Sequence, residues 1–462
     1  MNEFFFINKY GKKILFEDLP LIYKKFYLNS INSEIKVFQD KEKLSKIEKS
    51  TLDNYKKFFN ENKIEELERA DFSNLYSHDH QGDAGQLLLK PKLTILKKCL
   101  TFLVEKYVRE KLPEINEIES PNLYDTSISF IQDYLTKFPA RYYEVKNNKK
   151  EFALRFAACP NHFYYAKKNY LTEKQLPLYL FEMADCYRLE QTGELQGLKR
   201  VRKFLMQDCH IFTEENKELV EFFIILKHIK IFLKKLNLID LCVPTVRCSR
   251  EYYKINKRKL NKVAKIYNSP VFFEIWDTQK YYFQVKFEMN SMVNLHESQL
   301  STVQLDNVLP KTYNLNYFEK GEKKDLKALH MSLIGSLERL IEVMLRVGLP
   351  DNLQYPRILV LTEGEPSSLL QKNLKKLSKN IPIEVDSRKK DFYNRRKELT
   401  QKNENLQIIS FNKSEIIFFS PQMDIVSYRN NEKVLLKFKD LLKIKSFYKE
   451  LGSFYKTSAK QL

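Results

Sequence analysis

The sequence predicts an α/β protein of the α+β type: a large antiparallel sheet with flanking helices over residues 74–347, followed by a small α/β domain over residues 353–462. Two observations carry this prediction. Between residues 151 and 309, short aromatic or β-branched runs are joined mostly by loops, and strands without regular intervening helices tend to pair antiparallel. After Gly348, Pro350 and Pro356, strand-like and helix-like segments alternate, which is typical of βαβ units.

The first part of the chain is predicted to be mostly helical. Residues 1–73 are rich in Lys and Glu and are expected to form a short N-terminal helical extension. Residues 92–112 carry apolar side chains spaced by three and four positions, which predicts a helix with one apolar face. These side chains are Leu93, Leu96, Leu100, Leu103, Val104 and Tyr107. "EINEIESPNLYD" follows as a strand that Pro121 ends.

The middle of the chain mixes strands with two long helices. The predicted strands are "EFALRFAACPNH", "LPLYLFEMADCYRLE", "VRKFLMQDCHIF", "SPVFFEIWD", "YYFQVKFEM" and "LSTVQLDNVL". The predicted helices are "TEENKELVEFFIILKHIKIFLKKL" and "ALHMSLIGSLERLIEVMLRVG", and His330 lies near the start of the second. In the C-terminal domain, "RILVLTE", "IPIEVDS" and "LQIISFN" are predicted strands separated by two helices, "PSSLLQKNLKKLSKN" and "KDFYNRRKELTQKN".

The charge of the chain favours a polyanionic partner. The 462 residues carry a formal net charge of +20, with a pI near 9.3. Such a balance is typical of nucleic-acid-binding proteins. The richness in Lys, Asn, Ile and Phe is also what an AT-rich genome produces, so charge alone leaves both interpretations open.

No segment predicts a membrane span or a targeting signal. The most apolar stretch, "VEFFIILKHIKIFL", is interrupted by Lys227, His228 and Lys230. The N-terminus lacks the basic and apolar regions of a signal peptide. The six Cys include no CxxC pair, which suits a reducing compartment. We therefore expect a cytoplasmic protein without a membrane partner.

The segment from Cys186 to Phe212, "CYRLEQTGELQGLKRVRKFLMQDCHIF", predicts a strand, a charged glycine-bearing loop and a returning strand. A guanidinium such as that of Arg188 binds phosphate oxygens bidentately, and Glu190 can accept a hydrogen bond from an adenine amino group. An isolated Arg-x-Glu is more often part of a decorated surface hairpin, so this motif alone does not decide.

Histidine and cysteine residues suggest a metal site. Cys159, His210 and His330 come from separate elements, and His162 lies near Cys159. One Cys and two His would form a three-ligand Zn²⁺ site with an open fourth position. The spacing is a weak signal, because a single His is more often a satisfied polar residue of the core. Arg339 lies one turn into a helix that begins near Gly335 and Ser336, where it could bind a nucleotide or form a surface pair.

Taken in order, these motifs resemble the threonyl-tRNA synthetase family of class II aminoacyl-tRNA synthetases. "RLEQTGELQGLKRVRKF" with "QDCHIF" resembles motif 2, and "ALHMSLIGSLERLIEV" resembles motif 3. "LRFAACPNH", "STVQLDNVLP" and "SHDHQGDAGQLLL" resemble further family segments, and the helix after residue 90 with Pro121 resembles motif 1, the dimer element. The resemblance covers roughly residues 77–347. It implies a class II catalytic domain, and residues 353–462 are similar in pattern to the anticodon-binding domain.

The resemblance implies a role for each matching residue. Cys159, His210 and His330 match the ligands of one zinc ion per subunit. The other matches are Arg188 (α-phosphate of ATP), Glu190 (adenine), Arg339 (γ-phosphate), Arg200 (a basic motif 2 position), Asp208 (threonine hydroxyl), Gln304 (active-site lining) and Tyr282 (substrate amino group). The implied cofactors are Zn²⁺ and the Mg²⁺ that accompanies ATP. The implied partners are tRNA(Thr), ATP, L-threonine and a second copy of the chain in a homodimer.

The sequence also departs from the family pattern. Asn161 replaces the usual Gly after Cys-Pro, and Met206 replaces a Gln near the substrate. The family tyrosine is either Tyr282 or is replaced by Phe283. Only about 75 residues precede the catalytic domain, fewer than the family's domain for hydrolysing Ser-tRNA needs, so we expect no such editing within this chain.

The predicted function is ligation of L-threonine to tRNA(Thr), by ATP-dependent formation of threonyl-adenylate and transfer to the tRNA 3′ end. Such catalysis depends on positioning and charge stabilisation, which arginines and Mg²⁺ provide. Two alternatives remain open. One is another class II synthetase, of prolyl or seryl type, which would have no reason to keep three zinc ligands. The other is a catalytically inactive, RNA-binding paralogue, which would have no reason to keep phosphate-binding arginines.

Overall fold

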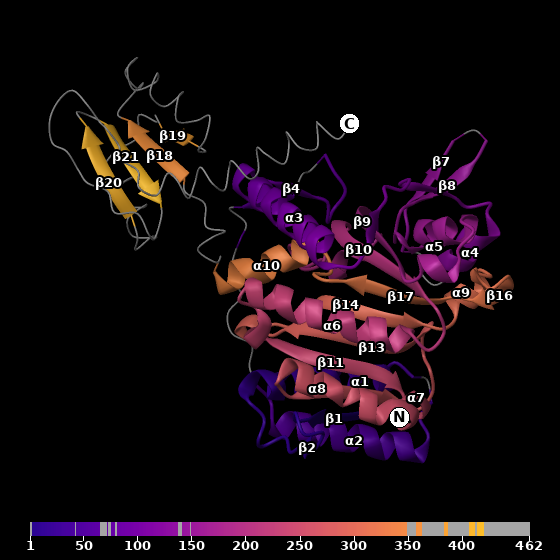
Figure 1. Ribbon diagram of the computed structural model, residues 1–462. Coiled ribbons are helices and arrows are strands. Elements are labelled where there is room, and N and C mark those ends of the chain that lie inside the picture. Colours follow the sequence, from indigo (N-terminus) through magenta and orange to yellow (C-terminus); the bar gives the residue numbers. More distant parts are fainter. Residues whose placement is uncertain are drawn as a thin grey trace. The chain divides into compact units, whose positions relative to one another are not determined.

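The structure, a computed structural model, describes residues 2–41, 43–64, 72, 75–78, 81–136, 141–147 and 149–348, together with four strands beyond residue 356 (Figure 1). The chain divides into two compact units, Met1–Gly348 and Leu349–Leu462. The candidate site lies in the first of them.

A ten-stranded sheet forms the centre of the first unit, in the order β2-β1-β12-β11-β13-β14-β17-β10-β9-β5. The strands are β1 (Glu3–Ile7), β2 (Lys13–Ile14), β5 (Ile115–Glu117), β9 (Leu178–Tyr187), β10 (Lys203–Thr213), β11 (Cys242–Ser249), β12 (Val271–Trp276), β13 (Phe283–Ser291), β14 (Ser298–Asp306) and β17 (Lys327–Ser332). Neighbouring strands are antiparallel except for β11–β12 and β5–β9. The predicted antiparallel sheet with flanking helices is confirmed, and parallel pairs are an addition to it.

Helices cover both faces of this sheet. The helices described in this unit are α1 (Leu21–Gln39), α2 (Lys46–Glu61), α3 (Pro91–Lys111), α4 (Ser129–Leu135), α5 (Cys159–Lys168), α6 (Glu218–Lys235), α7 (Arg250–Leu260), α8 (Lys262–Tyr267), α9 (Leu309–Thr312) and α10 (Leu337–Val347). Single 3₁₀ turns occur at η1 (Glu173–Gln175), η2 (Thr192–Glu194), η3 (Ile239–Leu241) and η4 (Val293–Leu295). Figure 1 shows α6, α7 and α8 together on one face.

The alternation of side chains along the strands decides what each face holds. On one face, Tyr179 of β9 hydrogen-bonds Glu221 of α6, and Tyr267 of α8 stacks on Phe287 of β13. On the other face, Phe26 of α1 packs edge-on against Phe272 of β12. The second face also carries the candidate site, on β9, β10, β14 and β17.

Three smaller sheets lie beside the main one. They are formed by β3 (Tyr76–His78) with β4 (Leu87–Leu89), by β6 (Leu123–Asp125), β7 (Glu144–Lys146) and β8 (Glu151–Leu154), and by β15 (Asn316–Glu319) with β16 (Glu322–Asp325). The predicted helix over residues 92–112 is α3, and Leu93, Leu96, Leu100, Val104 and Tyr107 of its predicted apolar face are buried.

The N-terminal segment differs from the helical extension predicted for residues 1–73. Helices α1 and α2 do lie there, but β1 precedes them and pairs antiparallel with β12 of the main sheet. The aromatic run Phe4–Phe6 explains the difference, because it supplies side chains to both faces of a strand. Phe5 stacks on Phe273, while Phe6 contacts Phe272 and Tyr23. This segment is therefore built into the sheet.

The predicted strand that Pro121 ends is present as β5, and β6 beyond Pro121 belongs to a different sheet. Two further predictions are corrected. His330 does not open a helix: it lies in β17, and α10 begins only at Leu337. Cys159 does not end a strand but begins α5. The segment around His330 was ambiguous, because Leu329, Met331 and Leu333 alternate as in a strand but lead directly into apolar residues with helical spacing.

The second unit contains a four-stranded sheet in the order β19-β18-β21-β20. Its strands are β18 (Arg357–Thr362), β19 (Ile383–Asp386), β20 (Leu406–Phe411) and β21 (Ser414–Phe419). The three predicted strands are present, and β18 and β19 are parallel as a βαβ unit requires. The strand β21 was not predicted. The two predicted helices of this domain lie outside the described residues.

Within the described ranges, no helix combines the length and the apolar character that crossing a bilayer requires.

Candidate active site

The sheet register gathers the candidate residues in one row. Gln304 of β14 pairs with His330 of β17, which pairs in turn with His210 of β10. Because alternate residues of a strand point to the same face, Asp208 lies on the same face as His210. Glu182 of β9 lies directly opposite Asp208. Residues that are far apart in the sequence thus meet on one surface of the sheet.

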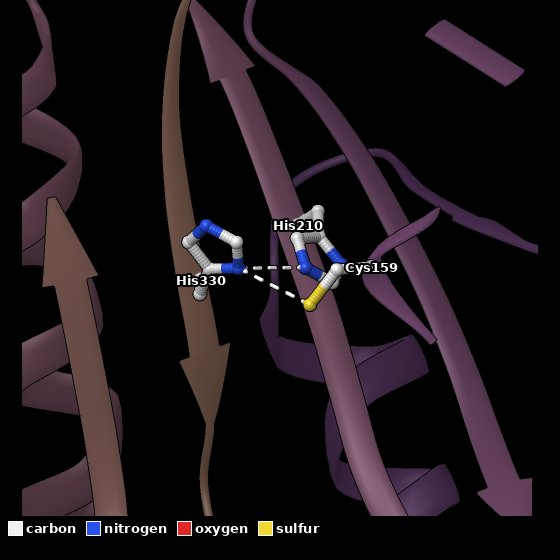
Figure 2. A group of neighbouring side chains, drawn as sticks. All are labelled: Cys159, His210 and His330. Carbon is white, nitrogen blue, oxygen red and sulfur yellow. Dashed lines mark hydrogen bonds between the residues drawn. The ribbon is translucent and has the colours of Figure 1, made fainter. Parts of the chain in front are cut away.

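Cys159, His210 and His330 converge on one point. The Cys159 Sγ, a ring nitrogen of His210 and a ring nitrogen of His330 all lie within 4.8 Å of one another. His330 Nδ1 is 3.4 Å from Cys159 Sγ and 2.9 Å from His210 Nε2 (Figure 2). Figure 2 shows the two imidazoles coming from neighbouring strands and the thiol facing them from α5. All three residues are buried.

The donor set and its surroundings suit a divalent cation. One thiol and two imidazoles are zinc ligands, and three protein ligands leave a fourth position for a small molecule. Burial opposes protonation of His330, yet Cys159 and Asp306 raise its pKa to about 10, so the imidazole is protonated at neutral pH and a bound cation would take the place of its Nδ1 proton. Burial, together with His162 and His330, lowers the pKa of His210, so its imidazole is neutral as a ligand must be.

Asp306 orients His330. Its Oδ2 lies 2.8 Å from His330 Nε2. Its Oδ1 accepts hydrogen bonds from the backbone N–H groups of Val308 and Leu309 at the start of α9. Since a carboxylate only accepts hydrogen bonds, His330 Nε2 carries a proton, and Nδ1 is the nitrogen that faces Cys159 and His210.

A second carboxylate lies behind His210. His162 Nδ1 is 3.0 Å from His210 Nδ1, and His162 Nε2 is 3.3 Å from Glu182 Oε2. Arg155 Nη1 donates to Glu182 Oε1 at 2.6 Å, and the Ser120 hydroxyl donates to Oε2 at 2.7 Å. Burial alone would raise the pKa of Glu182, but hydrogen bonds from His162 and Ser120 and the charge of Arg155 lower it to about 2.

Three arginines lie close together beside the cluster of Cys159, His210 and His330. Burial lowers the pKa of Arg339, and the charges of Arg188 and Arg200 lower it further, so three guanidinium groups share one region. Arg339 donates to the backbone carbonyls of Lys199 and Gln299, and Arg188 donates to that of Phe156. Clustered guanidinium groups are typical of sites that bind polyanions such as a triphosphate.

Glu190 is held at the same region by two arginines. Its carboxylate pairs with Arg141 at 2.5 Å and with Arg200 at 2.8 Å. Glu194 of η2 pairs with the same two arginines. The predicted loop of residues 191–199 is therefore anchored by ion pairs. These pairs are partly exposed, so they order the loop more than they stabilise the fold.

Tyr282, rather than Phe283, reaches the cluster. The Tyr282 hydroxyl donates to Gln304 Oε1 at 2.6 Å, and its ring lies 5.2 Å from that of His330. Phe283 packs against Trp276 and Tyr281 instead. Burial raises the pKa of Asp208, and the charges of His162, His330 and Arg188 oppose part of this rise. Gln304, Tyr282 and Asp208 thus line the space beside His330.

The substituted positions have ordinary structural partners. The Asn161 amide donates to the Pro121 carbonyl and lies 3.3 Å from the Tyr124 hydroxyl. Met206 packs against the apolar cluster that contains Val201 and Phe204. These side chains fit the surrounding fold.

Known proteins match the part of the chain that carries this site. Residues 138–347 match the family described as "tRNA synthetase class II core domain (G, H, P, S and T)". This part of the chain is thus similar to the class II tRNA synthetase core. All ten predicted site residues lie in this class II core.

Relatives of known name are threonine–tRNA ligases. The chain is 35% identical over 280 residues to "Threonine--tRNA ligase" of Thermococcus kodakarensis, covering 59% of this chain and 44% of the relative. It is 35% identical over 284 residues to the ligase of Methanosarcina acetivorans, covering 59% and 43%. The match thus spans less than half the length of these relatives.

Solved structures share the fold of the class II core. The structure described as the RNA binding domain of threonyl-tRNA synthetase from Cryptosporidium parvum Iowa II superposes with a TM-score of 0.60 at 20% identity, covering 72% of this chain and 86% of that one. Prolyl-tRNA synthetase from the same genus and species superposes with a TM-score of 0.53 at 14% identity, covering 73% and 65%. At these identities the likeness concerns fold alone.

The sequence analysis named residues that the structure places near one another, but it did not name the residues that support them. The structure unites Cys159, His210 and His330 as predicted, with Gln304, Tyr282 and Asp208 beside them. It adds Asp306, Glu182 and Arg155, none of which was singled out. Asp306 could have been found from the sequence, because it lies two residues after Gln304 and two such residues of a strand point to the same face. Glu182 and Arg155 become visible only once the strands are in register.

Proposed function

We propose that this protein ligates L-threonine to tRNA(Thr), first forming threonyl-adenylate from ATP and then transferring threonine to the tRNA 3′ end. The observation that carries the proposal is the convergence of Cys159, His210 and His330 on one point of a class II core. The 35% identity to ligases named for threonine supports the same substrate.

The cluster is proposed to hold one zinc ion. Cys159 would bind it through Sγ, His210 through Nε2 and His330 through Nδ1, which are the atoms that face one another. Bound zinc would supply a Lewis-acidic contact for the amino and hydroxyl groups of threonine, so that valine, which lacks the hydroxyl, is rejected.

The protein's own residues would position the reactants. Arg188 and Arg339 are proposed to bind the phosphates of ATP, with Arg200 nearby and Mg²⁺ bound to the nucleotide. Glu190, held by Arg141 and Arg200, would accept a hydrogen bond from adenine. The threonine carboxylate then attacks the α-phosphorus and pyrophosphate leaves, a reaction that needs orientation and charge stabilisation rather than a covalent group from the protein.

Gln304, Tyr282 and Asp208 are proposed to contact threonine. Tyr282 and Gln304 are already joined by a hydrogen bond next to His330, so their polar atoms are held in place. Asp208 lies on the same face as His210, where its carboxyl group can accept from the threonine hydroxyl. All three are therefore binding residues in this proposal.

The partners belong to the same proposal. Residues 353–462 are proposed to bind the anticodon, and residues 74–347 to carry catalysis. A homodimer is proposed through α3 and β5, because β5 is an edge strand of the ten-stranded sheet. A cytoplasmic location rests on the sequence alone.

The test is amino-acid-dependent exchange of pyrophosphate into ATP by the purified protein. Threonine should support exchange, whereas proline should not. His330→Ala and Cys159→Ala should each reduce threonine-dependent exchange by at least about 100-fold, because each removes a proposed metal ligand. His228→Ala and Cys248→Ala serve as matched controls, since both residues lie on elements outside the cluster. They should retain exchange within a few-fold.

Two outcomes would overturn the proposal. Exchange supported by proline and not by threonine would favour a prolyl-type enzyme. The solved prolyl-tRNA synthetase shares the fold of this chain. Absence of exchange with every amino acid, while the protein still binds RNA, would favour the inactive paralogue.

A further inference from the structure

Behind His210 lies a buried chain of groups that the proposed function does not use. It runs from Arg155 through Glu182 and His162 to His210. All four residues are buried, and His162 and His210 are completely inaccessible. His162 is not among the three residues that can meet at one metal position.

The direction of each hydrogen bond in this chain can be worked out. Glu182 receives bonds from Arg155 and Ser120, so it is an ionised acceptor. A carboxylate cannot donate, so His162 must donate from Nε2 to Glu182. A neutral imidazole has one N–H, which leaves His162 Nδ1 with a lone pair. His210 must then donate from Nδ1 to His162 Nδ1 across 3.0 Å.

That direction leaves His210 Nε2 without a proton. This is the atom 2.9 Å from His330 Nδ1 in the cluster. The other tautomer of His210 would place a proton on Nε2, where it blocks metal binding, and would set two lone pairs against each other at Nδ1. The two histidine ligands are thus oriented differently: His330 directly by the Asp306 carboxylate, His210 through a second histidine.

We propose that His162 is a positioning residue of the metal site, which accepts a hydrogen bond from His210 Nδ1 and so keeps His210 Nε2 available to the metal. This inference rests on the proposed zinc site. Partners of this kind orient metal-bound imidazoles and increase the affinity of a site for its metal. His162 itself touches neither the metal position nor the substrate.

Zinc affinity of the full-length protein tests the proposal. His162→Phe keeps an aromatic ring of similar size but removes the acceptor, and it should weaken zinc binding by about 10- to 100-fold in competition with a chromophoric chelator. His162→Gln keeps a carbonyl oxygen that can accept from His210 and an amide that can donate to Glu182. It should stay within a few-fold of the wild type.

The tautomer can be observed directly. In protein labelled with ¹⁵N-histidine, two-bond couplings distinguish a ring protonated at Nδ1 from one protonated at Nε2. His210 should be protonated at Nδ1 in the zinc-bound wild type and in His162→Gln. In zinc-free His162→Phe, the tautomer of His210 that is protonated at Nδ1 should no longer be the main one.

The outcomes separate the two proposals. If the wild type and Cys159→Ala bind zinc equally poorly, the metal site itself is wrong and the positioning role is wrong with it. If the wild type binds zinc and His162→Phe binds it as tightly, only the role of His162 is overturned. If His162→Phe does not fold, His162→Gln and the wild-type tautomer still decide, because Nε2 protonation of zinc-free His210 contradicts the inference.

Discussion

At the scale of single residues, the site depends on carboxylates that lie behind it. Glu182 is the clearest case, because it joins Arg155, Ser120 and His162 in a buried position. Breaking a buried pair by removing one partner leaves the other charge uncompensated, which is strongly destabilising. The same residue therefore links the stability of the fold to the geometry of the site.

Glu182→Gln should destabilise the protein in a pH-dependent manner. The pKa of Glu182 is about 2 in the folded protein, below its ordinary 4.5, so ionisation stabilises the fold above pH 4.5 and this contribution is lost as pH falls towards 2. At pH 7 the variant should be less stable by about 3 kcal/mol, and its stability should fall less steeply than that of the wild type between pH 5 and 3.

The measurement is urea unfolding at a series of pH values, followed by the fluorescence of the single Trp276, which lies in β12 of the same sheet. Glu144→Gln, an exposed position on β7, is the matched control and should change stability by less than about 0.5 kcal/mol. Equal curves for Glu182→Gln and the wild type would contradict the prediction.

At the scale of elements, the start of α10 sets the position of Arg339. Gly335 has φ of +64°, in the left-handed region that favours glycine. A Cβ there would lie 2.5 Å from the Leu300 carbonyl oxygen of β14. Ser336 then caps the helix by accepting from the Arg339 backbone N–H. The turn and the neighbouring strand thus leave α10 little freedom to shift.

Gly335→Ala should therefore disturb both stability and the proposed ATP site. The positive φ and the contact with a backbone oxygen should cost at least about 2 kcal/mol, and the Michaelis constant for ATP should rise because α10 carries Arg339. Thermal unfolding and exchange kinetics measure the two effects. Gly193→Ala is the control: a Cβ there meets nothing within 4 Å, and its unfolding temperature should be unchanged.

At the scale of the whole molecule, the positive charge is unevenly distributed. Residues 252–273 contain no Asp or Glu. Their exposed cations are Lys254, Lys257, Arg258, Lys259, Lys262 and Lys265 on α7 and α8. The apolar side of α7 is used in packing, since Tyr253 contacts Phe5 and Phe273. This basic surface lies on the face of the sheet opposite the Cys159 cluster.

Reversing charge on α7 should weaken the proposed binding of tRNA in a salt-dependent manner. The triple variant Lys257→Glu, Arg258→Glu, Lys259→Glu should bind tRNA more weakly at 50 mM salt, and its plot of log affinity against log salt should be less steep by about 2. The same reversal at Lys146, Lys149 and Lys150 is the control, because Lys146 and Lys150 pair with Glu151 and Asp125. An equal loss in both variants would indicate net charge rather than a defined surface.

Much of this arrangement was predictable from the sequence, and the failures have physical causes. The strands β9, β10, β12, β13 and β14 were predicted from short aromatic or β-branched runs, and the helices α3 and α6 from their apolar faces and length. The strand β17 was missed because Leu329 and Met331 lead directly into the apolar spacing of α10. The strand β1 was missed because its partner, β12, is remote in the sequence.

The residues that form the candidate site were predictable from the sequence, but the residues that support them were not. Arg188, His210 and His330 belong to local motifs that can be read along the chain. The hydrogen bonds of Asp306, His162 and Glu182 depend on which strands are neighbours and in which register, and periodicity does not contain that information. Supporting residues of this kind therefore had to be found in three dimensions.

The pairing of β1 with β12 has a consequence for biosynthesis. During translation the aromatic strand that holds Phe4, Phe5 and Phe6 is made about 260 residues before the strand it will adjoin. Until then these rings have no sheet to cover them, and contacts between such remote segments form slowly. A nascent chain would thus expose this aromatic segment for much of its synthesis, which makes early capture by a chaperone an expected feature of its maturation.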